Sequence, residues 1–247
     1  MKASLPRIVV ATALFGFALA ATAAAQDFQK SYRIGTGGQV RISNISGDVI
    51  VTGYDGDAII VKATKSGRDQ EVIEIEDRSG PANVDVGVRY PKNCNCDASV
   101  RFEVQAPRSV NYDYDRISSV SGEVQVTGVL GRLRASSVSG DVHIKEVSGS
   151  VSASSVSGGV KVEIARLEGS DDMKFSSVSG DVSVTAPATL DAEVDISSLS
   201  GSINTDFPVE VQKDRHGIHT SARGKLGEGS RHLKMSTVSG SLSLRHP

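Results

Sequence analysis

A short motif that returns six times between residues 117 and 244 constrains this chain more than any other feature. It reads "ISSVSGEVQV" at 117–126 and "ASSVSGDVHI" at 135–144, and the other copies begin at residues 153, 175, 196 and 235. The glycines of its Ser-Gly pairs are Gly122, Gly140, Gly158, Gly180, Gly201 and Gly240, and a further Ser-Gly pair between two copies contains Gly149. The steps along these seven glycines are 18, 9, 9, 22, 21 and 39 residues, which indicates a unit of about nine residues, paired into about 18, with a few residues inserted later. Self-similarity at a fixed period indicates a stack of repeated structural units.

The residues after each glycine predict short β-strands. Positions two and four beyond the glycine are apolar and the position between them is polar, as in Val142, His143 and Ile144. Alternation with period two is typical of a strand with one buried face. We therefore expect Val142 and Ile144, together with Val138 before the glycine, to pack inward, and His143 to face outward.

Each unit is thus expected to be a strand, a Ser-Gly corner and a second strand, stacked about 4.8 Å from the next unit. Glycine allows a positive φ at the corner, and Asp141 is expected to hydrogen-bond the turning backbone. A serine precedes the valine of each motif and is expected to stack as a ladder of its own. These serines are Ser119, Ser137, Ser155, Ser177 and Ser198.

The motif also occurs early, in "RISNISGDVIVTGYDGD" from residue 41, where Gly47 and Gly56 lie nine residues apart. Alternating runs at 71–77, 83–90 and 99–107 predict longer strands between Gly47 and Gly122. The predicted fold class is all-β, a single-domain β-solenoid or β-helix-like stack with half-rungs of about nine residues and about 18 per rung. We assign the domain to 26–247, with its repeat-dense part at 117–247; two parts divided near Arg116 are the alternative.

Residues 1–25 have the three-part pattern of a secretory signal peptide. Lys2 and Arg7 precede the apolar run 8–20, and small residues follow it. Cleavage is predicted after Ala25, with Ala23 as the alternative. A membrane anchor is disfavoured because a span needs roughly 20 apolar residues. The protein is therefore predicted to be periplasmic or secreted, without a transmembrane span in the mature chain.

Composition limits the classes of partner. Without Lys2 and Arg7, the 27 basic residues fall to 25 against 29 acidic residues, so the mature chain has a net charge of −4. A nucleic-acid partner is not predicted, because it would need clustered basic residues. Trp is absent and aromatic residues are few, so the core must consist mainly of Val, Ile, Leu and Ala.

Three segments resemble the bacterial putative-adhesin family, a β-repeat domain of unknown function. They are "VRISNISGDVIVTGYDGD", "VQAPRSVNYDYDRISSVSGEVQVTGVLGRL" and "LGEGSRHLKMSTVSGSLSL", with the serial "SSVSGDV" units between the last two. The resemblance covers nearly the whole mature chain. It implies an exported or envelope-associated β-solenoid-like domain and no established catalytic residues. The stretch "PKNCNCD" departs from the family pattern.

Cys94 and Cys96 are the only cysteines. In an oxidising compartment such a pair favours a disulfide, either local or intermolecular. Free thiols and a redox or metal-binding pair are the alternatives. A metal site would want about four ligands, and only Asn95 and Asp97 lie beside the pair.

Other reactive residue types are interpreted as solvated. His216 and His219 lie in a glycine-containing segment where three-residue spacing puts them on opposite faces, and His143 is an outward position. Two acidic pairs are likewise expected to be solvated, Asp171 with Asp172 and Glu74 with Glu76. No Gly-x-Ser-x-Gly elbow occurs. No catalytic, cofactor-binding or metal-binding residue is predicted; the structural turn residues are Gly47, Gly122, Gly140, Gly149, Gly158, Gly180, Gly201 and Gly240.

These features favour an exported, non-enzymatic scaffold that binds a partner at the cell envelope, in the manner of an adhesin. The partner is an unknown protein or an envelope polymer, and copies of the chain can associate through the ends of the solenoid. An envelope-stress or signalling accessory domain is one alternative. A polysaccharide-active β-helix enzyme is another, but it would need charges clustered on one face, and the outward residues form a mixed set. That set is Gln125, Arg134, His143, Ser152 and Lys161.

Overall fold

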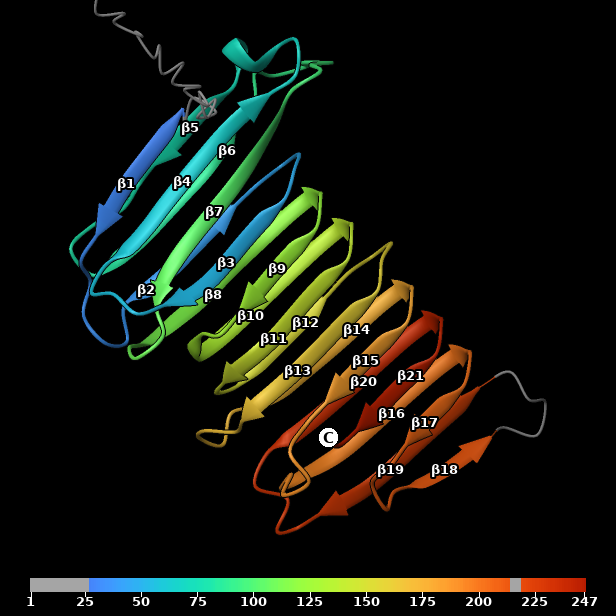
Figure 1. Ribbon diagram of the computed structural model, residues 1–247. Helices are drawn as coiled ribbons and strands as arrows, with labels where there is room; N and C mark the ends of the chain where they lie inside the picture. The colour runs from blue at the N-terminus through green and yellow to red at the C-terminus, as the bar shows by residue number, and fades with distance from the viewer. Residues whose placement is uncertain (1–26, 214–218) are drawn as a thin grey trace, which may run out of the picture.

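A computed structural model describes residues 27–213 and 219–247, in which 21 strands and one short 3-10 helix, η1 (Gln70–Val72), follow one another along the chain. The predicted all-β class is confirmed. The strands form two long ladders, and a pairing of Leu130 with Ser148 links the ladders into one mixed sheet (Figure 1). The predicted signal peptide and His216 lie outside the described residues.

The first ladder contains eleven strands, of which the central ones are parallel and the outer ones antiparallel. In spatial order it consists of β5 (Glu74–Asp77), β6 (Asn83–Arg89), β2 (Gln39–Ser43), β8 (Asn111–Ser121), β10 (Leu130–Ser139), β12 (Val151–Ser154), β14 (Met173–Ser179), β20 (His232–Ser239), β16 (Ala192–Ser200), β19 (Thr220–Leu226) and β18 (Glu210–Lys213).

The second ladder contains ten strands, which are antiparallel only at its first end. In spatial order it consists of β1 (Phe28–Tyr32), β4 (Ile59–Ser66), β7 (Ser99–Pro107), β3 (Val49–Tyr54), β9 (Val124–Thr127), β11 (Val142–Ser148), β13 (Val160–Arg166), β15 (Val182–Thr185), β21 (Leu242–Arg245) and β17 (Ile203–Thr205).

The repeat of the sequence sets the register of both ladders. Val142 pairs with Val124 on one side and with Val160 on the other, a step of 18 residues each way. Leu133 pairs with Val151, again 18 residues on. The Ser-Gly corner of each motif lies between a first-ladder strand such as β10 and the second-ladder strand that follows it, whereas Gly149 lies between β11 of the second ladder and β12 of the first. Successive nine-residue half-steps therefore belong to opposite ladders.

The units do not stack in simple chain order. The last unit, β20 with β21, lies between β14–β15 and β16–β17 (Figure 1, red between orange strands). The early unit, β2 with β3, likewise lies between β6–β7 and β8–β9. At both ends the chain thus returns to place a unit inside the stack.

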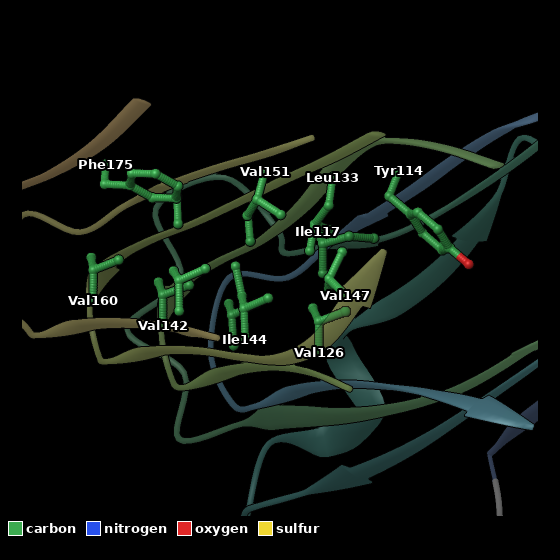
Figure 2. Packing of buried hydrophobic residues seen from close by; sticks show 14 of the residues in the cluster. Tyr114, Ile117, Val126, Leu133, Val142, Ile144, Val147, Val151, Val160 and Phe175 are labelled. Carbon is green, nitrogen blue, oxygen red and sulfur yellow. The ribbon is translucent and has the colours of Figure 1, made fainter. Parts of the chain in front are cut away.

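The core lies between the two ladders. Ile117, Leu133 and Phe175 of the first ladder point toward Val142 and Ile144 of the second, and all five are inaccessible to solvent (Figure 2). The apolar positions two and four beyond the glycines are buried as predicted. Burial of such aliphatic side chains stabilises the fold by about 1.5–3 kcal/mol each, and one unit alone has nothing to bury them against.

A ladder of inner serines runs along the corner, as the sequence predicts. The Ser137 hydroxyl donates to the Gly122 carbonyl of the preceding unit at 2.9 Å, and Ser155 donates to Gly140 at 2.8 Å. Threonine takes the same place at Thr237 of the last unit and at Thr220 of the antiparallel strand β19. The other members of the ladder are Ser119, Ser177, Ser198, Thr220 and Thr237. These hydroxyls satisfy carbonyl groups that the sheet leaves free at the corner.

The corner glycines are required mainly because neighbouring units approach closely. A Cβ on Gly140 would overlap the Gly122 carbonyl, although the φ of Gly140 is not in the left-handed region. Positive φ, which the sequence analysis expected at the corners, occurs at Gly47, Gly149 and Gly240. The same backbone overlap would occur at the remaining predicted turn glycines, Gly47, Gly122, Gly149, Gly158, Gly180, Gly201 and Gly240.

Two expectations at the corner need correction. Val138 does not pack inward but is 44% exposed. Alternation along β10 allows only one inward residue here, and Ser137 takes that place because its hydroxyl bonds the preceding unit. Asp141 does not bond its own turn, since its carboxylate accepts from the Gly159 N–H of the next unit at 2.7 Å.

A three-lane face as the candidate functional site

The outer face of the first ladder carries three parallel rows of side chains, which we call the apolar, hydroxyl and charged lanes. The apolar lane consists of Ile45, Val120, Val138, Val156, Val178, Val238 and Leu199. The hydroxyl lane consists of Ser43, Ser118, Ser136, Ser154, Ser176, Ser236 and Ser197. The charged lane consists of Arg41, Arg116, Arg134, Ser152, Lys174, Lys234 and Asp195.

Strand geometry explains the lanes. The lanes are two residues apart along each strand, about 6.6–6.8 Å, and members of one lane lie about 4.8 Å apart across the strands. The register is direct: Ser152 pairs with Lys174, Lys174 with Lys234, and Lys234 with Asp195. Every unit contributes one residue to each lane, so the face repeats along the stack.

The apolar lane collects most of the large hydrophobic side chains that are exposed. Nine such residues occur in the described ranges, and all except Val72 and Val211 belong to this lane. Their exposed fractions lie between 40% at Ile45 and 50% at Leu199. A contiguous apolar row of this kind marks an interaction surface more often than scattered residues do.

The hydroxyl lane differs from the inner serines next to it. Ser136 faces outward while Ser137 faces the corner, although the two are adjacent in the chain. In the part of the chain that the structure describes, none of the seven outer hydroxyls hydrogen-bonds another protein group. Each is therefore free to donate and accept toward a ligand.

The charged lane is predominantly cationic. Asp115 accepts from Arg41 at 2.8 Å and from Arg134 at 3.0 Å. These contacts, chiefly the hydrogen bond from Arg41, hold the pKa of Asp115 below its usual value. A β-bulge in β8 brings Arg116 into the lane beside Asp115.

Three cations of the lane are uncompensated. Within 27–213 and 219–247, Arg116, Lys174 and Lys234 form no ion pair. A shallow depression of about 410 Å³ lies between Arg134 and Lys174, where β12 offers only Ser152 and Ser154. Small side chains thus form the floor of this depression, cations flank it, and Asp115 lines it beside Arg116 and Arg134.

The outer face of the second ladder is irregular by comparison. Its corresponding row reads Ile50, Gln125, His143, Lys161 and Ser183 along the stack. His143 lies 3.5 Å from a Glu123 carboxylate oxygen and 3.9 Å from one of Asp141. The outward set that looked mixed in the sequence combined two faces, because Arg134 and Ser152 belong to the first ladder and the other three residues to the second.

Cys94 and Cys96 lie in the loop between β6 and β7. The structure joins their sulfur atoms in a disulfide, with the Cα atoms 5.1 Å apart. Cys96 packs against the edge of the hydrophobic core. The pair lies outside the three lanes.

The remaining candidate residues serve local contacts. Asp172 accepts from the His232 backbone N–H at 2.9 Å, and Asp171 from the Ser150 hydroxyl at 3.3 Å. Glu74 and Glu76 both pair with Arg89. His219 is exposed.

The described ranges contain neither a metal-binding cluster nor a membrane-spanning helix. No group of three or more His, Cys, Asp or Glu residues there is arranged to hold a metal ion. No helix there has the length and apolarity that crossing a membrane requires.

The three lanes are not evident from the residues after the glycine, on which the strand predictions rest. A signal was nevertheless present: a basic residue stands four positions before the exposed valine in several units, as Arg134 does before Val138 and Lys174 before Val178. Recognising it required knowing that the valine faces outward.

Comparison with known proteins places this geometry in a family. The family model Toastrack DUF4097 matches residues 108–245, more than half of the chain and nearly all of the lane-bearing units. The chain belongs to the Toastrack DUF4097 family. No curated protein matches it.

Two solved structures resemble the chain at low identity. A putative cell adhesion protein from Clostridium sporogenes is 11% identical, with a TM-score of 0.49, over 89% of this chain and 99% of that one. A putative adhesin from Bacteroides fragilis is 12% identical, with a TM-score of 0.37, over 88% of this chain and 96% of that one. Both likenesses are too distant to carry a functional conclusion.

Proposed function

We propose that this Toastrack DUF4097 protein is an exported, non-enzymatic β-solenoid that acts as a binding scaffold at the cell envelope. Export rests on the signal-peptide pattern of residues 1–25 and places the protein in the periplasm or outside the cell. The solenoid interpretation is supported by the 18-residue register in both ladders. Stacked repeats offer long surfaces suited to extended partners.

The three-lane face is the observation that carries the proposal. It keeps the same three kinds of side chain over successive units, whereas the core needs only the inward residues. A uniform outer face with free hydroxyls and unpaired cations suits an extended partner better than a reaction centre, which needs one distinctive arrangement of groups.

A retention experiment tests this function. Protein purified from cells that express the full chain is immobilised and exposed to a panel of envelope glycans and envelope proteins. We expect retention of a partner and no change in the molecular mass of any glycan. Turnover of a polysaccharide, with no partner retained, would contradict the scaffold role.

A further inference from the structure

We infer that the three-lane face is the binding surface for a linear acidic polysaccharide, which lies along the hydroxyl lane across successive units. This inference rests on the proposed function, because it names the partner of the same binding face. It assigns a separate role to each lane.

The charged lane selects carboxylates. Lys174 and Lys234 are neighbours in register, and neither has an acidic partner among the described residues. Arg116 extends the row on the other side of Ser152. The mature chain is acidic overall, yet this row contains one carboxylate of its own, Asp195. Of the carboxylates beside the row, Asp115 already holds Arg41 and Arg134, while Asp171 and Asp172 near Ser152 accept hydrogen bonds from Ser150 and from the His232 backbone. Charge complementarity therefore favours an anionic partner at this face.

The hydroxyl lane favours a sugar over a nucleic acid or a simple polyanion. A hydroxyl both donates and accepts, and a sugar ring presents groups of the same kind. Binding of single-stranded nucleic acid relies on aromatic side chains that stack on bases. No Phe, Tyr or Trp belongs to any of the three lanes.

The apolar lane covers the opposite edge of the ligand. Val138 of β10, Val156 just beyond the end of β12 and Val178 of β14 lie side by side across the units, each close to half exposed. The C–H faces of sugar rings can pack against such side chains, while ring carboxylates reach the cations across the hydroxyl lane. A narrow polymer that is apolar on one side and anionic on the other fits this order of lanes.

Binding of three soluble polymers tests the inference by biolayer interferometry, with the full-chain protein immobilised. The polymers are polygalacturonate, neutral hydroxyethyl cellulose and poly-glutamate, which has carboxylates but no sugar rings. We expect polygalacturonate to bind at least tenfold more tightly than either of the others. Its affinity should fall when NaCl is raised from 50 to 200 mM, because salt screens exposed charges.

A matched pair of double variants locates the site. Lys174→Glu with Lys234→Glu should weaken polygalacturonate binding at least tenfold. Lys145→Glu with Lys161→Glu makes the same charge change on the second ladder and should alter the affinity less than twofold. Val156→Ser should weaken polygalacturonate binding several-fold. All four lysines are exposed. Circular dichroism checks that each variant is folded. If a double variant does not fold, Lys174→Gln is used as a milder substitution.

Each contrary result has a distinct meaning. If poly-glutamate binds as tightly as polygalacturonate, the inference that the ligand is a sugar is wrong; the result points to an acidic protein segment as the partner of the same face. If hydroxyethyl cellulose binds as tightly as polygalacturonate, the inferred role of the carboxylates is wrong. If none of the three polymers binds but a protein is retained in the panel experiment, the polysaccharide inference is wrong and the scaffold function still stands. If the second-ladder variant loses more polygalacturonate affinity than the first-ladder variant, the three-lane face is not the binding site.

Discussion

The two outer faces of the stack are produced by the same repeat and yet differ in regularity. On the first ladder, the positions two, four and six residues before the glycine of each motif are apolar, hydroxyl and mostly cationic in unit after unit. On the second ladder, the position three beyond the glycine changes from Gln125 to His143 to Lys161. The core constrains neither face, because both point away from it. Uniformity on one face alone therefore indicates a requirement other than folding.

The largest loss of stability is expected for a substitution at the corner between the two faces. Gly140→Ala should lower the free energy of unfolding by roughly 2–4 kcal/mol, because the added Cβ overlaps the Gly122 carbonyl and the backbone must shift. Gly159→Ala is the matched control in the next unit, since its Cβ would meet its nearest atom at an ordinary 3.6 Å. Urea denaturation measures both. Equal losses in the two variants would show that close approach does not determine the corner.

Ser136 and Ser137, which are adjacent in the chain, allow the contribution of an outer hydroxyl to stability to be compared with that of an inner one. Ser137→Ala should cost about 1–2 kcal/mol of stability, because the Gly122 carbonyl loses the hydroxyl that satisfies it. Ser136→Ala should change stability by less than about 0.5 kcal/mol, as expected of a surface substitution. Denaturant midpoints with unchanged slopes would report the difference. A larger loss at Ser136 would mean that the hydroxyl lane is structural.

The smallest expected effect concerns the end where β1 and β5 close the two ladders. Lys30 contacts Asp77 at 2.5 Å between these edge strands. Burial opposes ionisation of Asp77, but hydrogen bonds from Lys30 and Ser79 outweigh it and lower its pKa to about 2. A lowered carboxyl pKa contributes stability above its unfolded value, which is lost as the pH falls from about 4 to 2.

Asp77→Asn provides the control for this pH dependence. The variant should be less stable than the parent at pH 6, and the difference should shrink toward pH 2. Thermal midpoints at several pH values measure it. A difference that stays constant across this range would contradict the role of the Asp77 charge.

Much of the fold is predictable because the core positions follow strict alternation. Val142 and Ile144 are buried as expected, and the inner serines form their ladder. The orientation of Val138 is not predictable in the same way, since an apolar residue beside two serines looks like a core residue. Only the hydrogen bond from Ser137 to the preceding unit decides which residue turns inward.

The repeated motif also does not determine the order in which the units stack. All units carry nearly the same motif, so β20 and β21 could pair with several neighbours equally well by pattern alone. Their place between β14–β15 and β16–β17 depends on the antiparallel return through β18 and β19, which lie outside the motif. The charged lane emerges only once this order is known, because Lys234 lies beside Lys174 although 60 residues separate them.

Chemical protection of lysines tests the central claim most directly. The full-chain protein is acetylated with a limiting amine-reactive reagent, with and without polygalacturonate, and modification at each lysine is read by mass spectrometry. The account predicts a several-fold loss of reactivity at Lys174 and Lys234, which lie in the charged lane, and none at Lys145 and Lys161 on the opposite face. Equal protection of both pairs, or protection of the second pair alone, would contradict it.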